Sequence, residues 1–411
     1  MSDAISSGAP RSALRRANLG AVLDHAWTTA EFTATDAMAK AGLTRSTTID
    51  VIEELGDRGL LRELPNARAG GDYRKGRPSR RFEFRADAGV VVGIDAGRAH
   101  LITTVADLRG NTLARTSVDL DPEHDEAAPR RAAAASALDA TLAAAGATRD
   151  EAIALCVGVP APVDASGMSP QHRDRFWQRM NPGFVEAFER TIPLVRVEND
   201  ASLAAVAEGS VGAAVGCRDY VVLLAGERLG AGVVVDGRLL RGAHGGVAEM
   251  VAFDHVTGVA GAWGLGYRAA QWAREDVAGG MIAPDRPLAL LAAAELDGRH
   301  VLELAASGDS DALRIAERVG EMLAVITGVF GSLFDPTRVI VSGAVAAGIE
   351  PVLRAAARAV PDELDLPSPE LLASPLGADV VSIGAVAGAV EIARAGILDL
   401  PRRARARAGA G

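Results

Sequence analysis

The sequence has few of the residues that define disulfide-rich, zinc-binding or membrane proteins. Among its 411 residues there are only two cysteines, Cys156 and Cys217, so a disulfide framework and a multi-cysteine zinc site are both excluded by number. Both cysteines have apolar neighbours, which favours buried small side chains over a disulfide. No uncharged apolar run approaches the ~18 residues of a transmembrane helix, and the first residues lack a secretion signal. We therefore expect a cytoplasmic protein that makes no contact with membranes.

Aromatic residues are also scarce. They make up 4% of the chain, whereas hydrophobic residues make up 49% and charged residues 23%, an ordinary balance for a globular protein. The cores must therefore consist mainly of small aliphatic side chains, and the length is sufficient for two or three of them.

Basic residues are outnumbered by acidic residues, and the formal net charge is -10. The first 86 residues nevertheless carry 14 Lys and Arg against 11 Asp and Glu, so the rest of the chain is the more acidic part. Such an asymmetry is expected when only the N-terminal part meets phosphates.

The segment 33–64 has the pattern of a helix-turn-helix followed by a strand. Residues 35–41 predict a short helix, Gly42 suits a tight turn, and Thr44 is a good N-cap for a second helix that ends near residue 56 or 58. An ordinary helical hairpin with capped ends is the alternative interpretation.

The N-terminal turns of the second helix are the candidate DNA-reading surface. Ile49, Ile52 and Leu55 are spaced to face inward, which would leave the hydroxyl and guanidinium groups of these turns exposed. Short hydroxyls and an arginine at this position of a recognition helix can donate to bases and phosphates. The candidate DNA-binding residues of the helix are Thr44, Arg45, Ser46, Thr47 and Thr48.

Two candidate strands, 60–64 and 81–84, flank a segment rich in glycine and arginine, as in the wing of a winged helix-turn-helix. Because Arg77 precedes Pro78, a helical conformation is disfavoured at this residue. An extended Arg77 can reach into a narrow minor groove. The candidate DNA contacts of the wing are Arg74, Lys75 and Arg77. A solvated, charged linker is the alternative.

From residue 89 onward, one order of elements occurs twice. The first copy predicts strands at 90–97, 101–107, 112–120 and 153–159, with a helix at 127–145. The second copy predicts strands at 220–225, 230–235, 238–240 and 338–342, with a helix at 312–334. This duplication predicts two ribonuclease-H-like lobes with a cleft between them.

Several motifs in these lobes are long and specific. They are Gly93-Ile94-Asp95-x-Gly97, Gly158-Val159-Pro160-x-Pro162-Val163-Asp164, Glu198-Asn199-Asp200-Ala201, and the stretch from Asp236-Gly237-Arg238 to His244-Gly245. With them the chain resembles the ROK family, which groups bacterial transcriptional repressors with sugar kinases. The resemblance implies an α/β fold: a winged helix-turn-helix at 11–86, then a two-lobed ribonuclease-H-like, actin-like ATPase domain with lobes at 89–210 and 211–400. A basic, disordered tail is expected at 401–411.

In this chain, the segments that bind phosphate in the kinases of this family have a different sequence. Where the resemblance implies Gly-Thr-Lys and Gly-Thr-Gly, this chain has Arg98-Ala99-His100 and Gly226-Glu227-Arg228, and the third glycine cluster is reduced to Ser342-Gly343-Ala344. A carboxylate at Glu227 would repel a polyanionic ligand. Because phosphoryl transfer depends on positioning and charge stabilisation, we expect no kinase activity and no cofactor.

Some of the residues that hold the sugar in the kinases of this family are retained in this chain. Asp200 matches the catalytic aspartate of the family, here in a degenerate kinase site, and Asn199 matches a neighbouring sugar-binding residue. An N-cap of helix 201–208 is the alternative role of Asp200. The histidine and the cysteines that would bind zinc are replaced by Ala252 and a cysteine-free segment, so no metal is expected. The candidate effector-binding residues are Asn199, Asp200 and Glu249, and a different effector or none at all stays open.

Together these features predict a DNA-binding transcriptional regulator that acts as a repressor. We expect a homodimer or tetramer on a double-stranded operator, with a ROK domain that dimerises and senses a small carbohydrate without phosphorylating it. A sugar kinase with an appended DNA-binding head is the main alternative, and a module that binds another protein is a third.

Overall fold

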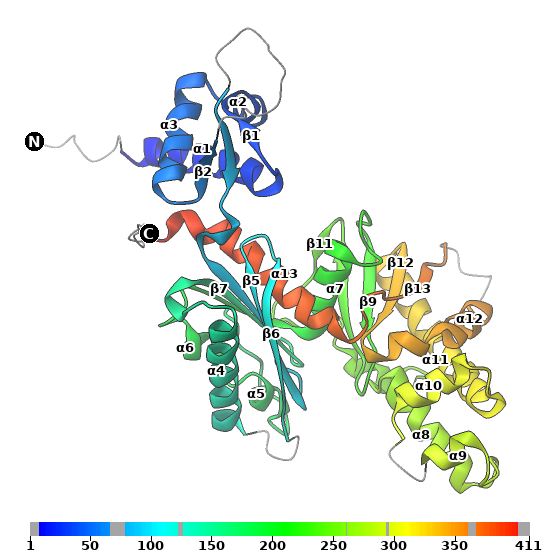
Figure 1. Cartoon of the computed structure of the whole chain (residues 1–411). Coiled ribbons are helices and arrows are strands. Elements are labelled where there is room, and N and C mark those ends of the chain that lie inside the picture. The colour runs from blue at the N-terminus through cyan, green and yellow to red at the C-terminus, as the bar shows by residue number, and fades with distance from the viewer. Residues whose placement is uncertain are drawn as a thin grey trace, which may run out of the picture.

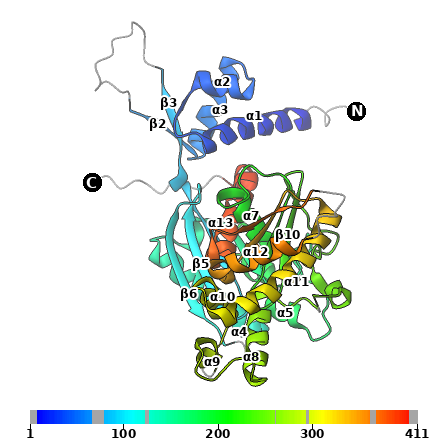
Figure 2. The same ribbon diagram turned by 90° about the vertical axis from the view of Figure 1, so that its right-hand side faces the viewer.

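The computed structural model describes residues 8–65, 79–121, 126–259, 261–292, 296–360 and 367–401. A small head sits at one end of a larger body made of two lobes (Figure 1), and the view at right angles shows strands β2 and β3 pointing away from the body (Figure 2). The expected wing tip, with Arg74, Lys75 and Arg77, lies outside the described residues, as does the basic tail beyond Pro401.

The head combines helices with a small antiparallel sheet in the order β1-β3-β2. Its elements are α1 (Gly8–Thr28), β1 (Phe32–Thr33), α2 (Ala34–Ala41), α3 (Arg45–Asp57), β2 (Leu61–Leu64) and β3 (Arg81–Phe84). The expected helix pair and both wing strands are therefore present. In this arrangement α2 and α3 form a helix-turn-helix, and α3 is its second helix.

Local chemistry explains why the helices begin and end where they do. Thr33 and Asp36 form a reciprocal capping box at the start of α2, and Gly42 ends that helix with a φ of 65°. Thr44 then caps α3, because its side chain accepts a hydrogen bond from the backbone N–H of Thr47.

Both lobes of the body are built on five-stranded sheets with the same strand order. Lobe 1 contains β4 (Val90–Asp95), β5 (His100–Asp107), β6 (Thr112–Asp119), β7 (Ala152–Val159) and β8 (Leu194–Asn199) in the order β6-β5-β4-β7-β8. Lobe 2 contains β9 (Tyr220–Leu224), β10 (Gly230–Val235), β11 (Arg238–Leu239), β12 (Arg338–Ser342) and β13 (Glu370–Ala373) in the order β11-β10-β9-β12-β13. In each sheet, in the order given, neighbours among the first three strands pair antiparallel and neighbours among the last three pair in parallel. The predicted duplication is confirmed.

Helices cover the sheets on both sides. Lobe 1 carries α4 (Ala127–Ala144), α5 (Phe176–Met180) and α6 (Phe184–Phe188), and α7 (Asp200–Val211) and α13 (Val380–Gly396) pack against the opposite face. Lobe 2 carries α8 (Leu265–Ala278), α9 (Pro287–Ala292), α10 (Gly298–Ala306), α11 (Ser310–Phe334) and α12 (Glu350–Ala359). Short 3-10 turns are η1 (Ala86–Ala88), η2 (Arg149–Glu151), η3 (Met250–His255), η4 (Ala344–Gly348), η5 (Gly377–Asp379) and η6 (Ile397–Asp399).

Helix α13 runs from the junction of the lobes to the underside of the head (Figure 1). Its backbone touches its neighbours at glycines: a Cβ on Gly93 of β4 would lie 2.6 Å from the backbone nitrogen of Val386, and one on Gly384 would overlap the carbonyl of Leu203 in α7. The segment Gly377–Asp399 is long and apolar enough to cross a membrane, but 56% of its most apolar window is buried inside the protein. These contacts identify it as a core helix.

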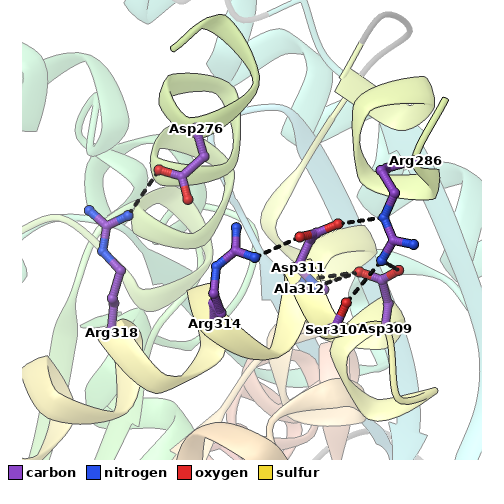
Figure 3. Close-up of polar contacts among 8 residues, drawn as sticks. All are labelled: Asp276, Arg286, Asp309, Ser310, Asp311, Ala312, Arg314 and Arg318. Atoms are coloured by element: carbon purple, nitrogen blue, oxygen red, sulfur yellow. Dashed lines mark hydrogen bonds and ion pairs between the residues drawn. The ribbon is translucent and has the colours of Figure 1, made fainter. Parts of the chain in front are cut away.

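Ion pairs fasten the start of α11 to neighbouring segments (Figure 3). Arg286, which precedes α9, donates to Asp311 at 2.7 Å, and Arg314 approaches the same carboxylate at 2.7 Å. One turn further along α11, Arg318 reaches Asp276 of α8 at 3.3 Å. Because Asp276 and Asp311 are buried, these contacts compensate carboxylates that have lost water.

Candidate DNA-binding surface and interlobe site

The N-terminal turn of α3 presents Thr44, Arg45 and Ser46 to solvent. The Thr44 hydroxyl lies 2.9 Å from that of Thr47, so both threonines are engaged in the cap. The expectation that Thr48 is exposed is wrong. Its side chain is buried, and its hydroxyl donates to the Thr44 carbonyl at 2.9 Å, because the helix turns this position toward the head core.

Arg45 differs from the other arginines of the head. Within the described part of the head, every other arginine whose side chain is placed forms an ion pair with a carboxylate: Arg15, Arg16, Arg58, Arg62, Arg80, Arg81 and Arg85. Arg45 has no such partner among the described residues and is exposed. The Arg45 guanidinium on the first turn of α3 is therefore available for a hydrogen-bond acceptor or an anion outside the described residues.

Arg58 ties the far end of α3 to the body. Its Nη1 donates to the backbone carbonyl of Leu398 at 2.9 Å, and its Nε and Nη2 donate to Glu54 at 3.2 and 2.9 Å. Glu54 is only 8% exposed and also accepts from Arg15 at 2.7 Å. Burial raises the pKa of Glu54, but the hydrogen bonds from Arg58 and Arg15 outweigh it, so the pKa lies below its ordinary value.

Further contacts fix α1 on the end of α13 and on η6, which follows it. Arg16 pairs with Asp399 at 2.8 Å, and Arg394 pairs with Asp24 at 2.7 Å. Arg109, in the turn between β5 and β6, donates to two backbone carbonyls near the C-terminal end of α1. The head therefore touches lobe 1 through α13 and through the β5–β6 turn.

Three carboxylates, Asp95, Asp200 and Glu249, define what we call the interlobe site. Asp95 ends β4, Asp200 begins α7, and Glu249 precedes η3. Burial is the main cause that raises the pKa of Asp200 to about 7; the negative charges of Asp95 and Glu249 add to it, and a hydrogen bond from the Ala201 N–H opposes it. Burial likewise raises the pKa of Glu249, against the attraction of a nearby histidine and arginine. Near neutral pH the Asp200 carboxyl can therefore either accept or donate a proton.

The N-cap of α7 is Asn199, so the alternative role of Asp200 as N-cap is wrong. The Asn199 side-chain oxygen accepts from the Ser202 N–H at 3.0 Å, and its amide nitrogen donates to the Ala161 carbonyl at 3.2 Å. Both ends of Asn199 are thus engaged within the protein, which leaves Asp200 and Glu249 as the freer of the candidate effector ligands.

The turn after β4 is filled by a side chain of this protein. The His100 ring covers Gly97 so closely that a Cβ there would overlap it, and His100 Nε2 lies 3.3 Å from Asp95 Oδ2. This hydrogen bond raises the pKa of His100, although burial works against it. Arg130 is buried and donates to the Gly97 carbonyl at 2.8 Å. The turn where the resemblance implies phosphate donors is therefore occupied by an imidazole.

Charged groups of the other altered loop are engaged with protein partners. Arg98 of lobe 1 reaches Glu227 of lobe 2, with Nη1 and Oε1 3.3 Å apart. The Arg228 guanidinium lies 4.4 Å from the centre of the Trp263 ring, which stacks on Tyr267 at 4.2 Å. The changes from the kinase motif thus build a contact between the lobes.

Both cysteines are free thiols that are at least partly shielded from solvent. Cys156 is buried as expected, and burial raises the pKa of its thiol to about 12. Cys217 is only partly buried, with its sulfur 2.9 Å from the Thr337 hydroxyl. Within the described residues, no three His, Cys, Asp or Glu side chains form a group that could hold a metal ion.

The tether through Glu54, Arg58 and Leu398 was not predicted. A weak signal existed, because Glu54 stands next to Leu55 on the apolar side of the α3 pattern, where a carboxylate needs a buried partner. Nothing in the local sequence, however, indicates that the second partner of Arg58 would be a backbone carbonyl 340 residues away.

Comparisons with known proteins agree on the family and divide on activity. The bifunctional enzyme NanE/NanK of Brucella suis is 35% identical over 193 residues, which cover 46% of this chain and 34% of that enzyme. A glucokinase of Streptomyces coelicolor is 26% identical over 276 residues, covering 62% of this chain and 82% of the relative. The chain thus matches only about a third of the length of the bifunctional enzyme.

Solved structures share the fold. A ROK family transcriptional regulator, a homologue of the E. coli MLC protein, superposes with a TM-score of 0.73 at 21% identity, covering 94% of this chain and 98% of that one. A Streptomyces griseus ROK glucokinase solved with glucose and AMPPNP gives a TM-score of 0.62 at 24% identity, covering 74% of this chain and all of that one. The ROK family model matches residues 91–395, and the chain belongs to the ROK family.

Proposed function

We propose that the protein is a DNA-binding transcriptional regulator that acts as a repressor. The observation that carries this proposal is the unpaired, exposed Arg45 on the first turn of the recognition helix. A helix of this kind meets the major groove with its N-terminal residues, where an arginine can bind a guanine or a phosphate. The basic wing residues Arg74, Lys75 and Arg77 would add contacts with the backbone or the minor groove.

The interlobe site favours sensing over catalysis. His100 fills the turn over Gly97, and Arg98 pairs with Glu227, so two regions that would hold ATP phosphates are engaged with protein groups. Asp200 and Glu249 retain carboxyls that can bind sugar hydroxyls. We infer a small carbohydrate effector that is bound without phosphorylation, and no nucleotide cofactor or metal.

Regulation would follow from coupling between this site and α3. Asp200 begins α7, and α7 packs against α13. The turn η6 follows α13, and its Leu398 carbonyl accepts from Arg58 at the C-terminal end of α3. An effector that prefers one arrangement of the lobes would therefore change the affinity for DNA. We expect the active form to be a cytoplasmic homodimer or tetramer on a roughly palindromic operator.

The experiment that tests this function is selection of bound duplexes from a random-core pool by the full-length protein. A regulator enriches one sequence, and its affinity for that duplex falls steeply as salt rises. Failure to enrich any sequence at low salt would remove the proposal.

An ATP-dependent sugar kinase is the second candidate, favoured by Asp200. A carboxyl with a pKa of about 7 is suited to act as a general base for a sugar hydroxyl. Incubation with ATP and a panel of hexoses and N-acetylhexosamines decides between the two. Turnover that is lost in Asp200→Asn would establish the kinase, whereas absence of turnover in the wild type supports the sensor.

A further inference from the structure

The exposed face of α3 carries more than the cap residues. Arg45, Ser46, Ile49 and Asp50 lie at spacings of one, four and five residues, so they share one side of the first two helical turns. We call these four residues the reading face. The opposite side of α3 is buried in the head and consists of Thr48, Val51, Ile52, Glu54 and Leu55.

Asp50 has no structural task within the described residues. The acidic residues Glu54, Glu63 and Glu83 pair with arginines, and Asp36 completes a capping box. Asp50 is exposed and forms neither an ion pair nor a side-chain hydrogen bond with any described residue. It is the sixth residue of α3, so the favourable field of the helix N-terminus has largely decayed there.

The chemistry of a carboxylate limits what it can meet on DNA. It only accepts hydrogen bonds, and it is repelled by phosphates, so a base amino group is the partner left in the major groove. Cytosine offers its N4 amino group without an acceptor on the same base edge, whereas adenine places the N7 acceptor beside N6. Ile49 lies next to Asp50 and is partly exposed, and its apolar side chain would help exclude water from such a contact.

We propose that Asp50 is a specificity-determining residue, which accepts a hydrogen bond from the N4 amino group of a cytosine in each operator half-site. This inference rests on the proposed function, because it requires that α3 enter the major groove. A base without a donor would leave the carboxylate desolvated and unpaired, so Asp50 acts mainly by rejecting other bases.

The test uses the full-length protein and the duplex that it selects from the random-core pool. Every base pair of one half-site is replaced in turn, and affinities are measured for the wild type, Asp50→Asn and Asp50→Ala. Asp57→Asn is the matched control, because Asp57 is exposed on the same helix but lies beyond the first two turns. It removes the same charge without touching the reading face.

The expected result is a wild-type preference for cytosine of roughly tenfold or more at one position. Asp50→Ala should abolish that preference, and Asp50→Asn should shift it toward adenine, since an amide can pair with adenine N6 and N7. Asp57→Asn should raise affinity uniformly and keep the preference. The inference is overturned if the Asp50 variants retain the wild-type base preferences, or if they alter affinity equally for all duplexes. If the wild type selects no sequence at all, it is the proposed function that fails.

Discussion

Substitution of Arg58 by alanine should loosen α3, because the Arg58 side chain holds the C-terminal end of this helix on the body. Arg58 supplies two hydrogen bonds to Glu54 and one to the Leu398 carbonyl. Glu54 is 8% exposed; in the variant it loses the bonds from Arg58 and keeps the bond from Arg15. A hydrogen bond between a charged group and a carbonyl contributes about 1.5–3 kcal/mol. The loss of the Arg58 bonds also removes part of the compensation of the buried Glu54 carboxylate. We expect the local stability of α3 to fall by about 2–4 kcal/mol.

Hydrogen exchange of α3 amides in the full-length protein measures this loss locally. Arg62→Ala is the control, because Arg62 is 56% exposed and pairs with Glu83 on the wing strands, where an ion pair contributes less than about 1 kcal/mol. Since the folded pKa of Glu54 is lowered, its contribution is fully present above the pKa of the unfolded chain and is lost as pH falls through the folded value. The difference in the local stability of α3 between the wild type and Arg58→Ala should therefore become smaller below about pH 4. Equal exchange in the Arg58 and Arg62 variants, or a gap that does not change with pH, would refute this account.

Three further outcomes can be checked. Arg45→Ala should weaken DNA binding by about 1–3 kcal/mol, with a flatter salt dependence if the contact is a phosphate and an altered base preference if it is a guanine. Gly384→Ala should lower the unfolding midpoint because the new methyl overlaps α7, whereas Gly328→Ala, where nothing lies within 4 Å, should stabilise α11 by about 0.5–1 kcal/mol. Arg286→Ala should destabilise lobe 2 above about pH 4 and have less effect below it, because the hydrogen bond from Arg286 lowers the pKa of Asp311; urea unfolding at pH 7 and pH 3.5 measures both.

Local patterns in the sequence are sufficient to predict most elements of this fold. The helix that follows Thr44, the strand 230–235 and the strand 338–342 are found where capping and apolar runs place them. These signals act over a few residues, so they can be interpreted without knowledge of the rest of the chain. The repeated order of strands then predicts the two lobes, and the structure confirms the order in both.

Features that depend on distant partners could not be predicted in this way. Thr48 was expected to be exposed because Ile49, Ile52 and Leu55 were expected to form the inward face of the helix. The packing of the head instead buries Thr48 and leaves Ile49 partly exposed. Asn199 takes the capping role considered for Asp200, because the carbonyl of Ala161 on a different segment orients its amide. From the sequence, His100 was only a departure from the kinase motif. Its ring fills the turn because it is hydrogen-bonded to Asp95, and this contact appears only in the structure.

The contact between Arg58 and Leu398 also has a consequence for how the protein is made. Ile397 and Leu398 belong to the same apolar cluster as Leu19 and Leu23 of α1, so the last helical segment completes the core beneath the first. The ribosome synthesises the head before the body, yet the underside of the head stays open until a segment about 340 residues later has been added. The head therefore becomes firmly seated on the body only after Leu398 has been translated.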